Sequence, residues 1–177
     1  MEEKNLYQKQ GMKLNYYEIR NGLQPLVLIH AQGVDATSFE NVWEQLSVNY
    51  HVYSVDCYGH GESLHDADQY NIETIGRAIA CFMEDVVQEK AFLLGHSSGG
   101  LIAAYTASQT KLCSCLILED PPFFLHRVKD GKIPLIMSIC LQSVAILSTS
   151  RKAGTSCCII SATSIYGTCS LKNQGKK

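Results

Sequence analysis

Apolar residues between positions 13 and 119 fall into short runs separated by amphipathic segments. Four runs are typical of strands that are covered on both faces of a sheet, namely residues 25–30, 51–56, 91–94 and 114–119. Residues 13–20 alternate more loosely between polar and apolar side chains, and we expect an edge strand there.

Three segments between these runs have the spacing of helices. Residues 37–48 are expected to begin with a capping box at Thr37-x-x-Glu40. Residues 71–89 predict a longer helix, and residues 99–110 are rich in small side chains, which suits close packing on a sheet. The apolar positions are Phe39, Val42, Trp43 and Leu46 in the first segment and Ile72, Ile75, Ile79, Phe82 and Val86 in the second.

This alternation of strands and helices indicates the fold class. Strand–helix–strand units connect parallel strands by right-handed crossovers. We therefore predict an α/β fold in which a parallel sheet carries helices on both faces.

Composition narrows the class of protein. The chain has 177 residues, 46% of them hydrophobic and 18% charged, which suits one globular core and excludes a collagen-like or largely disordered chain. Its formal net charge of -2 gives no electrostatic reason to expect a nucleic-acid partner. Residues 1–10 are polar and do not fit a secretory signal, so we expect a cytoplasmic location.

The last part of the chain differs from the rest. All 17 acidic residues lie in residues 1–130, whereas residues 131–177 hold six basic residues and no acidic one. We therefore divide the chain into a core, residues 1–123, and a divergent tail, residues 124–177. Its composition indicates no strand or helix that would cover the strand at 114–119, which we expect to be a sheet edge. The uncharged stretches 133–150 and 153–171 leave a membrane hairpin as an alternative, but their many Ser and Thr residues disfavour it.

The eight cysteines are expected to be reduced thiols. A disulfide framework is typical of small secreted chains, which the polar start does not indicate. Cys113-x-Cys115 has no second ligand pair at the spacing of a zinc site, so we expect no metal.

The strongest chemical signal is the string Gly95-His96-Ser97-Ser98-Gly99. It lies between a predicted buried strand and a predicted helix. A serine at such a bend is exposed above the sheet, and flanking glycines permit the crowded backbone. The alternative is a glycine-rich turn with an incidental serine.

Two further loops follow predicted strands. One reads His30-Ala31-Gln32-Gly33, and the other is the glycine-rich segment Asp56-Cys57-Tyr58-Gly59-His60-Gly61-Glu62-Ser63. Open α/β sheets bind ligands at the carboxyl ends of their strands. We expect these loops and the Ser97 bend to meet there.

Together these segments, with the strand-and-turn sequence Leu-Ile-Leu-Glu-Asp-Pro-Pro at residues 116–122, resemble the α/β-hydrolase fold family over residues 11–123. The resemblance implies a three-layer α/β sandwich and a serine hydrolase. Ser97 would transfer an acyl group from a small ester, amide or related carbonyl substrate, with the backbone N–H groups of Ser98 and Gln32 as oxyanion donors. It implies no cofactor, and loop-shaping roles for His30, His60 and His96. The sequence does not indicate an oligomeric state.

The resemblance also implies an acid and a base, for which Asp120 and His126 are the candidates. The family's order is nucleophile, acid, histidine, and His126 is the only histidine after Ser97. Asp120 stands where some members have the acid, although capping of the Glu-Asp-Pro-Pro turn is the favoured interpretation. We expect a shortened family member, incomplete at the C-terminal edge of the sheet. The alternative function is a catalytically impaired chain or a binding module without a working acid and base.

Overall fold

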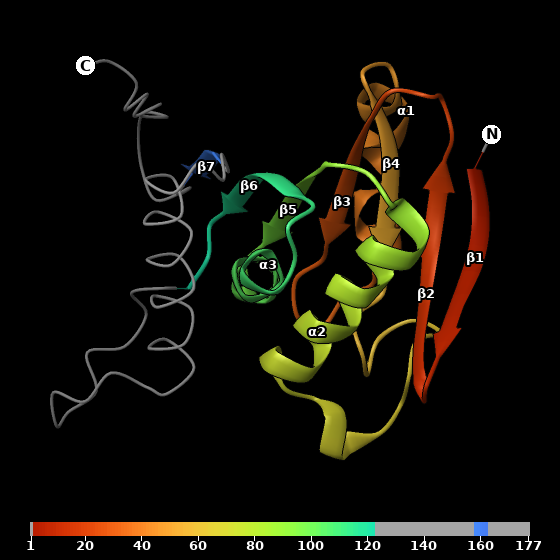
Figure 1. Cartoon of the computed structure of the whole chain (residues 1–177), viewed down its shortest axis with the longest axis vertical. Coiled ribbons are helices and arrows are strands. Elements are labelled where there is room, and N and C mark those ends of the chain that lie inside the picture. Colours follow the sequence, from red (N-terminus) through yellow and green to blue (C-terminus); the bar gives the residue numbers. More distant parts are fainter. Residues whose placement is uncertain (1, 123–157, 163–177) are drawn as a thin grey trace, which may run out of the picture.

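A single mixed sheet organises the part of the chain that the structure describes. The structure is a computed structural model, and it describes residues 2–122 and 158–162. These residues contribute seven strands in the order β1-β2-β4-β3-β5-β6-β7 (Figure 1). The strands are β1 (Glu2–Lys9), β2 (Met12–Ile19), β3 (Gln24–Ile29), β4 (Tyr50–Val55), β5 (Ala91–His96), β6 (Cys113–Glu119) and β7 (Cys158–Ala162).

The sheet is mostly parallel, as predicted. β4, β3, β5, β6 and β7 run parallel, while β2 is antiparallel to both β1 and β4. The register pairs Leu26 of β3 with Val52 of β4, and Ile29 of β3 with Gly95 of β5. The carboxyl ends of these three strands therefore lie side by side.

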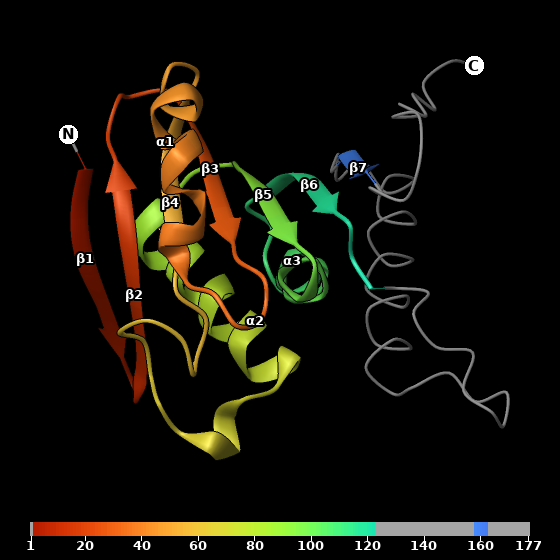
Figure 2. The ribbon, with the colours of Figure 1, turned by 180° about the vertical axis from the view of Figure 1, so that it is seen from behind.

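Helices cover both faces of the sheet, which also confirms the prediction. α1 packs on one face, and α2 and α3 pack on the other (Figures 1 and 2). The helical segments are the 3₁₀ turn η1 (Ala36–Phe39), α1 (Glu40–Ser47), the 3₁₀ turn η2 (Ala67–Gln69), α2 (Ile72–Phe82), the π-helical turn η3 (Met83–Val87) and α3 (Ser98–Gln109).

The central strand β3 explains why its sequence is a continuous apolar run. Leu26 and Leu28 join the cluster that contains Trp43 of α1. Val27 and Ile29 point to the other face and join the larger cluster beneath α2 and α3. Since successive side chains of a strand point to opposite faces, a strand covered on both sides needs apolar residues at every position.

The two strands that were predicted to lie at the edges of the sheet, β2 and β6, both have a neighbour on each side. β2, predicted at residues 13–20, lies inside the sheet because β1 pairs with its outer side. β6 is not an edge either, since β7 from the predicted tail pairs with it in parallel from Cys115↔Cys158 to Glu119↔Ala162. The domain boundary at residue 123 stays a prediction, but one strand from beyond it belongs to the sheet.

The predicted cap of the first helix was also wrong. The segment begins as the 3₁₀ turn η1, and Asp35 accepts the N–H of Thr37 at 2.9 Å and its hydroxyl at 2.5 Å. The Thr37-x-x-Glu40 box is therefore not formed. The helix predicted at residues 71–89 begins as predicted, and Asn71 caps it by accepting the N–H of Thr74 at 2.8 Å. Its α-helical part ends at Phe82, and the π-helical turn η3 continues it to Val87.

The cysteines of the described part of the chain are not all reduced. Cys57 and Cys81 are free thiols, whereas Cys115 is disulfide-bonded, contrary to the reduced state expected for it. Among residues 2–122 and 158–162, no helix has the length and apolar content needed to cross a bilayer. The uncharged stretch 133–150 lies outside the described residues, as does most of 153–171.

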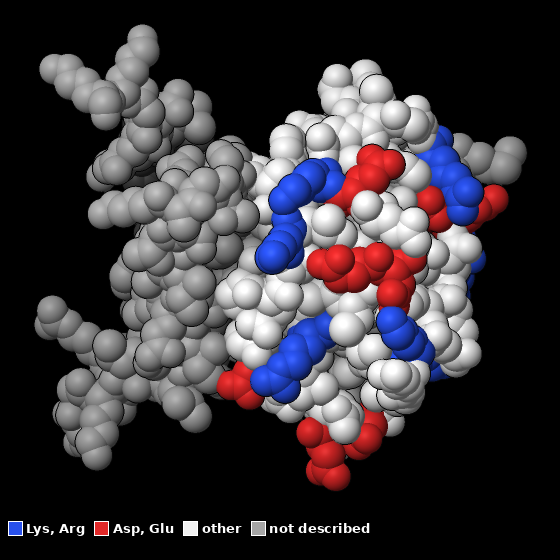
Figure 3. All heavy atoms as spheres, in the orientation of Figure 1, with Lys and Arg blue, Asp and Glu red and all other residues white. Residues whose placement is uncertain are grey.

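Charge on one face of the molecule is evenly distributed. In the described part of the face drawn in Figure 3, basic and acidic side chains are interspersed. Lys4 pairs with Glu62 and Lys9 pairs with Asp85. This face therefore carries no broad field of one sign.

Candidate active site

Ser97 occupies a bend of one residue between β5 and α3. β5 ends at His96, α3 begins at Ser98, and the backbone of Ser97 adopts φ 52° and ψ −120°. Its N–H donates to the carbonyl of Glu119 in β6 at 2.8 Å, and its carbonyl accepts the N–H of Gly100 at 2.9 Å. Positive φ is costly for a residue with a side chain, by roughly 1–2 kcal/mol, so these bonds hold a strained conformation.

The side chain of Ser97 is left available by this bend. The residue is half-buried, and its hydroxyl makes no hydrogen bond within the described part of the chain. The structure therefore places Ser97 at the strand-to-helix bend that the sequence predicted, and not inside a continuous helix.

Gly95 and Gly99 are required by close backbone packing. A Cβ atom on Gly95 would lie 2.3 Å from the carbonyl oxygen of Gly99. A Cβ atom on Gly99 would lie 2.4 Å from the carbonyl oxygens of Ile29 and His30. The first turn of α3 therefore packs directly on β5 and β3, which fixes the position of Ser97 relative to the loop after β3.

His30 connects the loops that follow β3 and β4. Its side chain is buried, with the residue 2% exposed, and Nδ1 lies 2.8 Å from the carbonyl oxygen of Ala31. Nε2 accepts the N–H of Cys57 at 2.9 Å. Nδ1 therefore carries the hydrogen and Nε2 the lone pair, which is a neutral imidazole. Burial lowers the pKa of His30 from its ordinary value, and this favours the same neutral form.

His60 makes a similar connection. Its Nδ1 lies 3.1 Å from the carbonyl oxygen of Tyr58, and its Nε2 accepts the N–H of Gly33 at 3.2 Å. The rings of His60 and His30 meet edge to face with centroids 5.0 Å apart. Both rings thus use both nitrogens to hold backbone, while the side chain of His96 is exposed at the end of β5.

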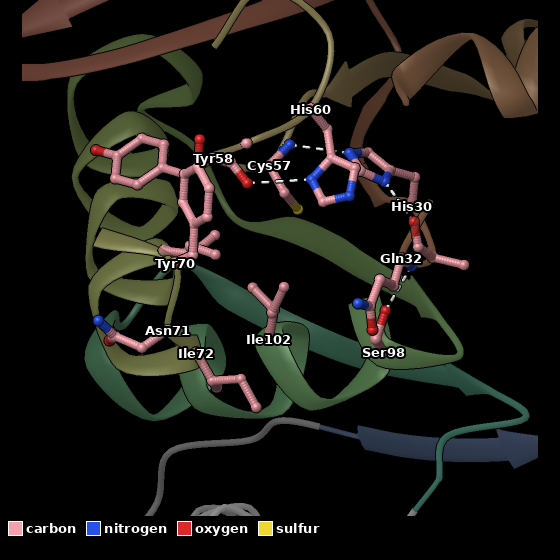
Figure 4. Close-up of a pocket in the computed structure, with 13 residues that line it drawn as sticks. His30, Gln32, Cys57, Tyr58, His60, Tyr70, Asn71, Ile72, Ser98 and Ile102 are labelled. Carbon is pink, nitrogen blue, oxygen red and sulfur yellow. Dashed lines mark hydrogen bonds between the residues drawn. The ribbon is translucent and has the colours of Figure 1, made fainter. Parts of the chain in front are cut away.

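Gln32 and Ser98 lie in contact. The backbone N–H of Gln32 donates to the hydroxyl oxygen of Ser98 at 2.6 Å, as drawn in Figure 4. Gly33, the next residue, turns the chain away with φ 83°. The structure therefore brings together the two residues that the sequence singled out as oxyanion donors, but the N–H of Gln32 is directed at a side chain.

A buried carboxylate, Asp56, holds the loop after β4. The residue is 2% exposed, and Oδ1 accepts the N–H of Ala36 at 2.8 Å. Oδ2 accepts from the side-chain amide of Asn15 at 2.7 Å and from the N–H of Glu62 at 3.1 Å. Gly61 packs on this carboxylate so closely that a Cβ atom would lie 1.8 Å from Oδ2. The sequence located this loop, but it did not reveal the network that shapes it.

A cavity of about 250 Å³ opens beside these loops (Figure 4). Ser98 and Gln32 lie at one end, and the rings of Tyr70 and Tyr58 and the side chains of Ile72 and Ile102 form much of the rest. Ser97 does not line the cavity, although its neighbour Ser98 does. The full lining is His30, Ala31, Gln32, Cys57, Tyr58, Gly59, His60, Tyr70, Asn71, Ile72, Ile75, Ser98 and Ile102.

Sequence reasoning did not connect Tyr70 and Ile102 with this site. Tyr70 is 46% exposed, and its ring lies against Gly59, where a Cβ atom would be 2.9 Å away. Ile102 lies one helical turn after Ser98 on α3. The only sequence signal for Ile102 was this i, i+4 spacing, which places both side chains on one face of the helix.

The structure describes the predicted acid but not the predicted base. Asp120 directly follows β6, has φ 46° and is half-buried, and Glu119 before it accepts the N–H of Ser97. No hydrogen bond of the Asp120 side chain occurs within the described residues, and the first backbone N–H after Pro121 and Pro122 lies outside them, so both the acid role and the capping role stay predictions. His126 lies outside the described residues, and its role stays a prediction.

Known proteins share this sequence and fold. A family model described as the alpha/beta hydrolase fold matches residues 24–169. A pimeloyl-[acyl-carrier protein] methyl ester esterase from Aeromonas salmonicida is 31% identical over 124 residues, which are 68% of this chain and 47% of that protein. An (E)-2-((N-methylformamido)methylene)succinate hydrolase from Acinetobacter baylyi is 36% identical over 103 residues, covering 58% and 38%.

A solved structure shows the same arrangement. The N-formylmaleamic acid deformylase from Pseudomonas putida S16 superposes with a TM-score of 0.64 at 25% identity, over 68% of this chain and 48% of that one. The chain thus spans about half the length of the relatives that it matches.

Proposed function

Because the chain belongs to the alpha/beta hydrolase fold family, we propose that it cleaves a small ester, amide or related carbonyl compound by acyl transfer to Ser97. The observation that carries this proposal is the backbone of Ser97, held at positive φ between β5 and α3, with a hydroxyl that makes no hydrogen bond to any residue that the structure describes. A serine in this position can approach a substrate without moving the scaffold.

The proposed reaction has two steps. The Ser97 oxygen bonds to the carbonyl carbon, the electron pair of the C=O bond moves to oxygen, and a base takes the hydroxyl proton. Collapse of the oxyanion expels the alcohol or amine, which receives that proton. Water then attacks the acyl-serine through the same base, and the acid product leaves as Ser97 regains its proton. We assign the base to His126 and the acid to Asp120.

The surroundings of Ser97 support stabilisation of the oxyanion. α3 begins at Ser98, so its first N–H groups have no partners within the helix and point toward the bend. The loop of Gln32 adjoins Ser98. Each donor to an oxyanion is worth about 10²–10³ in kcat.

The cavity favours a substrate with an uncharged apolar part. Its lining includes Tyr70, Ile72 and Ile102, and its two histidines have their ring nitrogens bonded to backbone. The matched relatives include a methyl ester esterase and a hydrolase of an N-methylformamido compound. Both names agree with the cleavage of a carbonyl compound.

A fluorophosphonate probe tests the proposal, because it phosphonylates an activated serine. Folded wild-type chain should be labelled, and Ser97→Ala should lose the label. Ser108→Ala is the matched control, since Ser108 is also on α3 but donates to the carbonyl of Tyr105 at 2.7 Å. Equal labelling of Ser97→Ala and wild type, or none in folded wild type, would contradict the proposal.

A second function, ligand binding without turnover, is favoured by one observation. Neither His30 nor His60, the histidines beside the cavity, has a ring nitrogen free to act as a base. A site without a working base retains roughly 10³–10⁴-fold acceleration over water. Steady turnover of a p-nitrophenyl ester that is lost in both Ser97→Ala and His126→Ala would exclude this second function.

A further inference from the structure

We propose that the side-chain hydroxyl of Ser98 is a catalytic donor to the oxyanion, acting together with the backbone N–H of the same residue. The inference rests on the proposed function, in which the oxyanion forms next to Ser97. The sequence suggested the N–H of Gln32 as a direct donor to the oxyanion. Here the N–H of Gln32 instead bonds to the Ser98 hydroxyl and positions it.

The bond between Gln32 and Ser98 runs from the backbone N–H of Gln32 to the side-chain oxygen of Ser98. A backbone N–H has a single hydrogen, and that of Gln32 is directed at the Ser98 oxygen at 2.6 Å. In this arrangement the Gln32 N–H has no hydrogen left for an oxyanion. The bond fills one lone pair of the hydroxyl and leaves the hydroxyl hydrogen to find another acceptor.

The surroundings of Ser98 leave its hydroxyl hydrogen available to an acceptor in the site. Within the residues that the structure describes, the Ser98 hydroxyl donates to no acceptor, and the residue lines the cavity at the end nearest the bend (Figure 4). A hydroxyl that accepts a hydrogen bond becomes a stronger donor, since chains of hydrogen bonds polarise one another. An oxygen that gains negative charge beside Ser97, at this end of the cavity, would supply the acceptor that the described residues do not.

Ser98 is held in place from two sides. Its backbone begins α3, which Gly95 and Gly99 hold against β5 and β3. Its hydroxyl is held by the loop of Gln32, which His30 and Gly33 fix through the bonds described above. A donor that is fixed before the reaction stabilises a developing charge without reorganisation.

Two other roles for Ser98 make different predictions. If its hydroxyl only blocks the N–H of Gln32, removal of the hydroxyl would free that donor and raise kcat. If the bond only joins two loops, removal would lower stability and leave the kinetics of the folded protein unchanged. A donor role instead predicts a loss of kcat with little change in KM.

The kinetic experiment compares Ser98→Ala and Ser98→Thr with wild type on a p-nitrophenyl ester. We expect Ser98→Ala to lower kcat by about 10²–10³ with KM within about twofold, and Ser98→Thr to recover much of the loss. Ser108→Ala, on the same helix, should behave as wild type. An unchanged or higher kcat in folded Ser98→Ala, or no recovery in folded Ser98→Thr, would overturn the inference.

A binding experiment decides the inference even for a chain without turnover. In the Ser97→Ala background, titration with the diethyl phosphate anion, followed by the NMR shifts of the Gln32 and Ser98 amides, measures affinity for a tetrahedral oxyanion. Adding Ser98→Ala should weaken binding about tenfold or more. Equal affinity, or no binding in the Ser97→Ala background, would overturn the inference. If binding depends on Ser98 but wild type neither reacts with the fluorophosphonate nor turns over, only the proposed function has failed.

Discussion

At the residue scale, the glycines of this chain serve two different physical needs. Gly95 lies where the first turn of α3 passes over β5, and a Cβ atom there would meet backbone atoms of Gly99 and Gly100 at 2.3–2.6 Å. Gly22 has open space around its missing Cβ atom but adopts φ 73°. Gly95 is therefore required because a side chain has no room there, and Gly22 because the backbone adopts a positive φ.

Alanine substitutions should separate these two needs. Gly22→Ala is expected to cost about 1 kcal/mol, which is the strain of positive φ. Gly95→Ala is expected to cost about 3 kcal/mol, because rigid backbone must move to admit the methyl group. Chemical denaturation of both variants measures the difference. A Gly95→Ala variant that is no less stable than Gly22→Ala would show that the packing of α3 on β5 is looser than described.

The site residues that could be predicted were those that belong to one short sequence motif. Gly95, Ser97 and Gly99 needed only their neighbours and a flanking strand and helix. Gln32 and Ser98 were found through the resemblance, but the bond between them was not. The network of Asp56 and the contact of Tyr70 with Gly59 join residues that are distant in sequence, and no local pattern encodes such pairs.

At the scale of elements, β1 shows why a polar strand escapes sequence patterns. Among its residues only Tyr7 is buried, so the strand lacks the apolar alternation that predicts one. It is held instead by pairing with β2 and by Asp85, which follows α2. The hydroxyl of Tyr7 donates to Oδ2 of Asp85 at 2.6 Å, and Lys9 donates to the same oxygen at 2.7 Å.

These bonds make the attachment of β1 dependent on pH. The hydrogen bonds from Lys9 and then Tyr7 lower the pKa of Asp85 below its ordinary value. A lowered carboxyl pKa in the folded state gives stability that is present above the unfolded pKa, about 4, and is lost as pH falls through the folded pKa. We expect wild type to lose more stability than Asp85→Asn between pH 5 and about 2, measured by urea denaturation. The same slope in Asp85→Asn as in wild type would refute this role.

At the scale of the whole molecule, the parallel arrangement of the inner strands could be predicted from the sequence, whereas the edges of the sheet could not. Alternation of apolar runs with helices predicts parallel neighbours, because each helix crosses a face of the sheet. The edges depend on which segment pairs with an outer strand, and neither β1 nor β7 has the apolar pattern that would predict a strand. β1 is polar, and β7 lies in a stretch rich in Ser, Thr and Cys.

Hydrogen exchange should show the inner position of β6. In a parallel strand, successive N–H groups point to alternate neighbours, so pairing with both β5 and β7 protects both sets. We expect slow exchange at consecutive amides from Cys115 to Glu119. In β1, which among the described strands pairs only with β2, every second amide should exchange faster. Fast exchange of alternate amides in β6 would mean that β7 does not pair with it in solution.

The bond between His30 and Cys57 has a consequence for the conditions in which this protein can work. An imidazole nitrogen accepts a hydrogen bond only while it carries no proton, and the link between the two loops depends on that lone pair. Since burial keeps the pKa of His30 below its ordinary value of about 6.5, the unfolded chain takes up a proton before the folded one does as the solution acidifies. Acid therefore weakens the link between these two loops beside the cavity, whereas neutral or mildly alkaline solution keeps it, and these are the conditions for purification and storage.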